Sequence, residues 1–167
     1  VLVDSSVLPR SYHTFRNVVS FRVNIMYYGH IGLLFDTLLQ TLPNLTYLIF
    51  HQLSTYRIAG QETLPLNLEP LPRCLLVSLK SIEFQKFNCY PKEVHVVELF
   101  LKSARVLRRI TLGRATSYYS GTKYMDRKKL TPKELEDAAD KFRDRILERL
   151  QAFPRASADC LVKYSGP

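Results

Sequence analysis

The sequence predicts an α/β fold: a right-handed solenoid of strand–helix units, with a parallel sheet on one face and helices on the other. Two observations support this. A spaced apolar frame (apolar, two residues, apolar, one residue, apolar) starts at Val18, Leu45, Leu79 and Leu107, at intervals of 27, 34 and 28 residues. Helical apolar periodicity fills two of these intervals. A single unit cannot bury its own apolar face, so we expect neighbouring units to stack.

A period of 20–30 residues with this spacing is typical of leucine-rich repeats. Alternation along each strand turns the second and third apolar residues of the frame into the core, and the first closes the turn. Two units also superpose at an offset of 62 residues. The apolar positions that match are Leu39, Leu42, Leu45, Leu48 and Phe50 with Leu101, Ala104, Leu107, Ile110 and Leu112.

Two helices are predicted between the strands. Residues 31–41 have apolar side chains at helical spacing, and Pro43 stops that helix. Residues 91–104 form the second helix, in which Pro91 and Glu93 suit the first turn. Its predicted buried face consists of Val94, Val97, Leu101 and Ala104.

Two insertions interrupt the repeats. Residues 51–73 contain three prolines and read as a long surface connection that replaces a helix. Residues 113–130 are polar, basic and punctuated by glycine.

A long helix and a strand then close the solenoid. Thr131 and Glu134 form a capping box around Pro132, and Pro154 ends the helix. The expected buried stripe comprises Leu135, Ala139, Phe142, Ile146, Leu150 and Phe153. Leu130 and Leu135 are placed for a hydrophobic staple. The tail, residues 159–164, reads as a strand with Cys160 and Val162 facing the core.

Charge and cysteine content limit the class of protein. The net charge of +9 would attract nucleic acid, anionic lipid or an acidic protein, although a solvated basic surface is the simpler interpretation. Three widely spaced cysteines make no disulfide framework, and Cys74 reads as a buried thiol, so we expect the cytoplasm or nucleus. No run approaches the roughly 18 apolar residues of a membrane span, so we expect no membrane partner. The first residue is Val, which suggests a fragment or a processed chain.

No constellation of residues indicates catalysis. Cys74, Cys89 and His95 contain no close cysteine pair, so structural thiols are favoured over a metal site. The sequence has no glycine-rich phosphate loop and no nucleophile elbow. We therefore expect a non-enzymatic protein without cofactor or metal.

Residues 71–164 resemble the plant FBD domain, the C-terminal module of many plant F-box proteins with leucine-rich repeats. The matching pieces are Pro72-Arg73-Cys74-Leu75-Leu76, Leu79 to Phe84, Glu93 to Leu112, and Phe153-Pro154-Arg155-Ala156-Ser157-Ala158-Asp159-Cys160. Residues 15–50 look like the leucine-rich repeats that precede this domain. The expected division is therefore a repeat segment, residues 1–70, and an FBD domain, residues 71–167, packed on the same solenoid.

The resemblance implies substrate recognition for a cullin-based (SCF) ubiquitin ligase, in which an F-box binds the Skp1 adaptor. This sequence contains no F-box-like segment, so Skp1 is an expected partner only if an F-box lies upstream. It also lacks the tryptophan that relatives often carry ahead of the Pro-Arg-Cys-Leu piece, and the insertion at 113–130 is longer than expected. The family supplies no catalytic residues, and the identity of the protein client stays open.

Two surfaces are candidate binding sites. The first is the concave strand face, where side chains between the core positions would meet a protein client; they are Arg22, Tyr47, Ile49, Glu83, Arg109 and Thr111. The alternative for these residues is an exposed strand surface without a partner. The second, for a basic nucleic-acid-binding module, interleaves aromatics and cations: Arg114, Tyr118, Tyr119, Lys123, Arg127, Lys128 and Lys129. No recognised nucleic-acid motif accompanies it.

Overall fold

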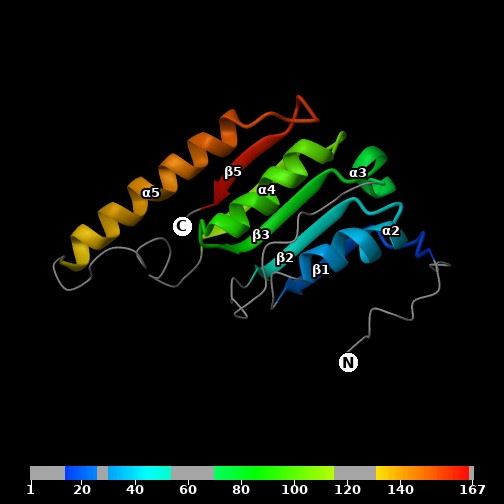
Figure 1. The fold of residues 1–167 in the computed structure, drawn as a ribbon, viewed down its shortest axis with the longest axis horizontal. Helices are drawn as coiled ribbons and strands as arrows, with labels where there is room; N and C mark the ends of the chain where they lie inside the picture. Colours follow the sequence, from blue (N-terminus) through cyan, green and yellow to red (C-terminus); the bar gives the residue numbers. More distant parts are fainter. Residues whose placement is uncertain (1–13, 26–29, 54–69, 115–130, 166–167) are drawn as a thin grey trace.

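The structure is a computed structural model and describes residues 14–25, 30–53, 70–114 and 131–165 (Figure 1). Its strands are β1 (Ser20–Ile25), β2 (Tyr47–Leu53), β3 (Ser81–Phe87), β4 (Arg109–Arg114) and β5 (Leu161–Ser165). Its helices are α1 (His30–Leu33), η1 (Leu34–Leu38), α2 (Leu39–Thr41), α3 (Arg73–Val77), α4 (Pro91–Ser103) and α5 (Pro132–Ala152). The fold is mixed α/β, as predicted.

The five strands form one parallel sheet in the order of the sequence, β1-β2-β3-β4-β5. The register confirms the predicted apolar frame, because equivalent frame residues lie side by side on neighbouring strands. One core row is Phe21, Leu48, Ile82, Ile110 and Val162; the next is Val23, Phe50, Phe84, Leu112 and Tyr164. Phe50 and Phe84 stack with ring centroids 4.7 Å apart.

The helix predicted for residues 31–41 is present, but its middle turn is wider than an α-helix. The segment runs through α1, η1 and α2, and the amide of Leu39 donates to the carbonyl of Leu34, five residues earlier. Ile31, Leu34, Phe35 and Leu39 are buried against the sheet.

Helix α4 confirms the prediction for residues 91–104 and its buried face. It is buried on more sides than predicted: Val96 and Phe100 are also enclosed. The reason is that α4 packs between two neighbours. Phe100 meets Phe35 of η1 with centroids 4.9 Å apart, and Glu98 pairs with Arg149 of α5 at 2.6 Å. These contacts are to elements far away in the sequence, so the apolar periodicity of the helix alone does not predict them.

The irregular connection predicted for residues 51–73 is wrong at both ends. Strand β2 continues to Leu53, and α3 begins at Arg73, directly after the prolines. Pro72 lies at the N-cap of α3, where the missing amide proton costs no intrahelical hydrogen bond. Residues 54–69 of the first predicted insertion and residues 115–130 of the second lie outside the described residues, so the second is described only at Gly113 and Arg114, where β4 ends.

Helix α5 begins with the predicted capping box: Thr131 Oγ1 accepts from the amide of Glu134, and Glu134 accepts from the amide of Thr131 at 2.7 Å. The predicted stripe is buried at Leu150, whereas the other stripe residues are half-buried. The amino-terminal half of α5 extends beyond the sheet (Figure 1). Leu130, the partner in the predicted staple, lies outside the described residues. Cys160 and Val162 face the core, as predicted.

None of the helices found in the described ranges is long and apolar enough to cross a membrane.

Candidate functional site

The candidate site is the open face of the sheet, opposite the core and its helices. Because side chains alternate along each strand and the strands are in register, the outward-facing residues form straight rows. The first row is Ser20, Tyr47, Ser81, Arg109 and Leu161; the second is Arg22, Ile49, Glu83, Thr111 and Lys163. All six residues predicted for the concave face lie in these two rows.

The fifth strand adds Leu161 and Lys163 to the rows, and the sequence analysis did not select them. The sequence contains the information needed to select them: if Cys160 and Val162 face the core, alternation along the strand turns Leu161 and Lys163 outward. Without a structure, nothing showed that this strand would pair with β4 in the same register.

Exposure and charge differ between the edges and the centre of this face. Arg22, Arg109 and Lys163 are exposed, whereas Glu83 is half-buried on the central strand. Within the described ranges, none of these three cations forms an ion pair or a side-chain hydrogen bond. Tyr47, which is 49% exposed, adds an aromatic surface. The open face thus offers unpaired cations beside apolar area.

The carboxyl ends of β2 and β3 carry a polar contact on the same sheet. His51 Nδ1 lies 2.9 Å from Gln85 Oε1, a geometry in which the ring nitrogen donates. The pairing of β3 with β4 shifts register between Phe84 and Phe87. Gly113 permits this shift, because a Cβ atom there would lie 2.5 Å from the carbonyl oxygen of Gln85.

The predicted basic patch can be located only at Arg114. This residue ends β4, is exposed, and lies opposite Phe87 in the register. The other six members of the patch, Tyr118, Tyr119, Lys123, Arg127, Lys128 and Lys129, lie outside the described residues.

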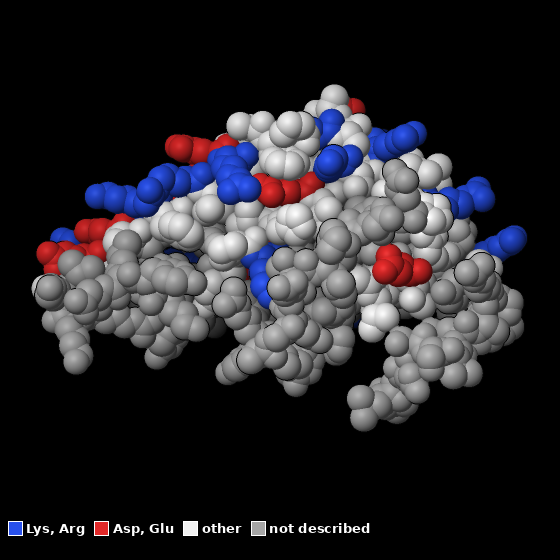
Figure 2. All heavy atoms as spheres, in the orientation of Figure 1, with Lys and Arg blue, Asp and Glu red and all other residues white. Residues whose placement is uncertain are grey.

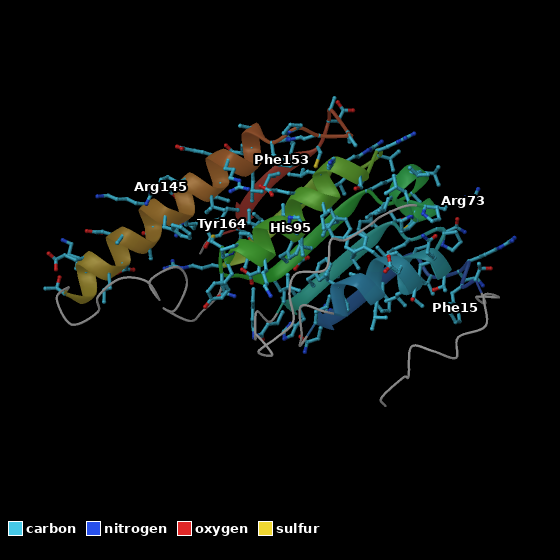
Figure 3. All side chains as sticks on the ribbon, in the orientation of Figure 1. Phe15, Arg73, His95, Arg145, Phe153 and Tyr164 are labelled. Atoms are coloured by element: carbon cyan, nitrogen blue, oxygen red, sulfur yellow. The ribbon has the colours of Figure 1, made fainter. Side chains whose placement is uncertain are left out.

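The cysteines are free and buried. Burial raises the pKa of Cys74 to about 11, and burial together with the nearby Glu93 raises the pKa of Cys89 to about 12. Both thiols are therefore protonated at neutral pH, and a thiol is a poor nucleophile and metal ligand. His95 is exposed on α4 (Figure 3). No group of His, Cys, Asp or Glu in the described part of the chain could hold a metal ion.

Glu93 is a buried carboxyl group that organises the start of α4. It accepts hydrogen bonds from the amide of Asn88 at 2.8 Å, the side-chain amide of Asn88 at 3.1 Å and the amide of Tyr90 at 3.1 Å. Burial outweighs these bonds and raises the pKa of Glu93 to about 7. In this loop the backbone of Cys89 has a φ of 60°, a value that residues other than glycine seldom adopt. We assign Glu93 a structural role.

Two of the pieces that carry the FBD resemblance also have structural roles. In the first, Leu75 accepts a hydrogen bond from the amide of Arg105 at 2.8 Å, and Ser78, which follows this piece, donates to the carbonyls of Pro43 and Leu45 at 3.0 and 2.9 Å. These bonds connect α3 to the turns before β2 and β4.

In the second piece, the guanidinium of Arg155 donates to the carbonyls of Gln151 and Leu150 at the end of α5, and to that of Cys160 before β5. The amide of Ala156 donates to Leu101 of α4 at 2.8 Å. This piece therefore joins α4, α5 and β5.

Comparison with known proteins agrees with the first of these pieces. Residues 68–112 match the family model described as FBD. The chain is 30% identical over 126 residues to an FBD-associated F-box protein of Arabidopsis thaliana, an alignment that covers 75% of this chain and 22% of that protein. The chain thus spans about a fifth of the length of this relative. No solved structure matches it. The leucine-rich-repeat part of the predicted resemblance stays a prediction, whereas the FBD part of the resemblance is confirmed by the family match over residues 68–112.

Proposed function

We propose that this chain is a non-enzymatic protein-recognition module, which binds a protein client through the open face of its sheet. The observation that carries the proposal is the pair of rows across five parallel strands, in which exposed cations stand beside Tyr47 and Leu161. Arginine and tyrosine are enriched among the residues that contribute most to protein–protein binding. Rows of this kind lose little backbone conformational entropy on binding, because the paired strands already hold the backbone in place.

The proposed context is an F-box-type protein of an SCF ubiquitin ligase. The support is the FBD match together with the printed description of the Arabidopsis relative as an F-box protein. In this proposal the present chain selects the client, and a Skp1-type adaptor binds only through an F-box located elsewhere in the protein. The expected location is the cytoplasm or nucleus.

We further propose that the strands and helices are units of a leucine-rich-repeat-like, right-handed solenoid. The sequential parallel order of the sheet and the alignment of frame residues from all four predicted units support this. The repeat segment, residues 1–70, and the FBD domain, residues 71–167, would then share one continuous core. In agreement with that, β2 and β3 pair directly from Tyr47↔Ser81 to Phe50↔Phe84.

The proposal is tested by proximity capture with the full-length protein that contains this chain, scored by quantitative mass spectrometry. A face variant combines Arg22→Glu with Ile49→Ser, which are paired across β1 and β2. A control variant combines Arg145→Glu with Ala152→Ser, the same charge change on exposed residues of α5. We expect clients whose recovery falls at least tenfold in the face variant and is unchanged in the control, while Skp1 recovery is equal in all three proteins.

Equal client recovery from the face variant and the control would exclude the open face as the binding site. Absence of Skp1 from every sample would exclude the ubiquitin-ligase context. Binding of generic RNA that weakens steeply between low and moderate salt would instead favour the basic module at residues 113–130.

A further inference from the structure

The second row of the open face has a regular order of charge. From β1 to β5 it consists of Arg22, Ile49, Glu83, Thr111 and Lys163, one residue from each strand. Neighbouring strands lie about 4.8 Å apart, so roughly 10 Å separates Glu83 from Arg22 on one side and from Lys163 on the other. The row therefore presents a positive, a negative and a positive charge at nearly equal intervals.

These three charged side chains are available to a partner. Arg22 and Lys163 are exposed and Glu83 is half-buried, and among the described residues none of them has an ion pair or a side-chain hydrogen bond. A continuous line of phosphates would meet Glu83 as well as the cations, so the row does not favour a nucleic acid. A protein partner would have to supply the opposite order of charge, because like charges that face each other across an interface oppose binding.

Apolar surface lies on one side of the central carboxylate. Ile49 is half-buried between Arg22 and Glu83, and Tyr47 stands two residues earlier on the same strand, 49% exposed. On the other side of Glu83 the equivalent residue of the row is Thr111, which is polar. Read from β1 to β5, the complementary surface is therefore acidic, apolar, basic, polar and acidic.

An α-helix that lies across the strands matches this spacing. Residues three, four and seven positions apart share one face of a helix, and 3.5 residues advance about 5.3 Å, close to the strand spacing of about 4.8 Å. In an extended chain the residues on one face are about 6.6 Å apart, so their steps fall out of phase with the strands. A helix of about fifteen residues would place one contact position above each strand.

Helix α5 of a second copy fits the charges but not the apolar surface. It carries an acid, a base and an acid at seven-residue intervals, all exposed: Glu134, Lys141 and Glu148. The positions between them on this face hold three charged residues and Ala138, so no large apolar side chain could cover Tyr47. Figure 2 shows this character, with acidic and basic side chains interspersed along α5. The row therefore favours a helix of a different protein.

We propose that the open face binds a client α-helix that lies across its five strands. The contact face of this helix has an acidic residue near each end, which meets Arg22 or Lys163, and a basic residue midway, which meets Glu83. Large apolar residues between the base and one acid cover Ile49 and Tyr47. This inference rests on the proposed function, because it names the kind of segment by which the open face recognises its client.

The test measures binding of fluorescent eighteen-residue peptides to the purified chain by fluorescence anisotropy. The matched peptide is alanine-rich, with two glutamates on one helical face, a lysine seven residues from each, and two leucines between the lysine and one glutamate. A reordered peptide exchanges the lysine with one glutamate and so keeps the composition and net charge. A third peptide has glutamate at all three positions, and a fourth has a central proline, which breaks the helix.

We expect the matched peptide to bind at least tenfold more tightly than the reordered and the proline peptides, and at least threefold more tightly than the all-glutamate peptide. The last comparison separates recognition of the charge order from general attraction to a basic protein, because the all-glutamate peptide carries the larger negative charge. Preference for the all-glutamate peptide, or equal binding of the proline peptide, would overturn the inference.

Variants of the central carboxylate then locate the contact. Glu83→Lys should weaken binding of the matched peptide at least tenfold and make the all-glutamate peptide the tighter ligand, because it reverses the charge that the lysine meets. Glu83→Gln, the milder change at this half-buried position, should remove the difference between these two peptides. Glu136→Lys is the matched control on the exposed surface of α5 and should bind all four peptides as the unchanged chain does. Circular dichroism verifies that each variant is folded.

The outcomes separate this inference from the proposed function. If no peptide binds, or if the Glu83 variants bind like the control, the inference fails, and the proposed function stands only if proximity capture still shows clients that depend on the open face. If those clients are also missing, both fail. Self-association of the chain in sedimentation, abolished by Glu134→Lys with Glu148→Lys, would overturn the inference in favour of α5 from a second copy.

Discussion

Replacement of Arg155 by methionine should destabilise the packing of α5 and β5, the last two elements of the fold. The side chain of Arg155 is half-buried, and its guanidinium donates to three carbonyl groups, those of Leu150, Gln151 and Cys160. Two of these belong to the last turn of α5, where carbonyls have no partner within the helix. Methionine keeps an unbranched stem but donates no hydrogen bond, so all three acceptors lose this donor.

The magnitude follows from the number and kind of bonds. A hydrogen bond from a charged donor contributes about 1.5–3 kcal/mol, with the lower end for groups that water can reach. Because Arg155 is half-buried and water would replace part of the lost contacts, we expect the free energy of unfolding to fall by roughly 2–4 kcal/mol in total. This is a large share of the roughly 5–15 kcal/mol that typically stabilises a domain.

The assay is urea unfolding of both proteins, combined with amide hydrogen exchange. Exchange at Val162 and Tyr164 in β5 should accelerate more than at Ile82 in the sheet centre, because the lost bonds hold the carboxyl-terminal elements. Arg145→Met is the matched control. Arg145 is exposed, and among the described residues its side chain bonds only to the carbonyl of Lys141 in its own helix at 3.4 Å, so the loss should stay below about 0.5 kcal/mol. Equal stability of the two variants would refute the proposed role of Arg155.

Three further predictions concern single contacts. Gly113→Ala should lower the free energy of unfolding by roughly 1–3 kcal/mol in urea unfolding, and adding Gln85→Ala should not rescue it, because the clash is with a backbone carbonyl. Since burial raises the pKa of Glu93 from 4.5 to about 7, folding disfavours its charged form, and the free energy of unfolding should fall by up to about 3 kcal/mol as pH rises from 4.5 to above 7. Glu93→Gln should lack that slope in unfolding measured across this range, and an unchanged slope would contradict the assignment. A double-mutant cycle with Glu98→Gln and Arg149→Met should give a coupling of about 1 kcal/mol, because Glu98 is buried and both Nε and Nη2 of Arg149 contact its Oε1; additive losses would show that the pair is unimportant.

The strands and most helices were predictable because their information is local and periodic. The frame starting at Leu45 and Leu107 recurs in register on β2 and β4, and the capping box at Thr131 marks the start of α5 without any tertiary contact. The short α3 escaped prediction because five residues give too little periodicity to recognise beside three prolines. The role of Glu93 also escaped, because its burial depends on how the loop before α4 folds over it.

The candidate site was predicted in part for a similar reason. Alternation placed Arg22, Ile49 and Glu83 on the outward face, and the register then aligned them with Thr111 and Lys163. The frames that start at Leu79 and Leu107 make Lys80 and Arg108 equivalent positions, but only the structure shows that the two units are direct neighbours in the sheet. Their proximity arises from the backbone bonds between successive units.

The amino-acid sequence alone therefore specifies the units: where each strand begins, which of its faces is apolar, and which residues mark the FBD resemblance. These properties follow from the type and spacing of residues within short stretches of chain, because helix and strand geometry fix which nearby side chains share a face. The tertiary structure decided what no single unit contains, namely the order and register of the strands, the enclosure of Glu93 and Cys89, the bonds of Arg155, and the rows of side chains on the open face. Those features arise from contacts between residues far apart in the chain, and the free energy of such contacts depends on the packing of the whole core rather than on any local pattern.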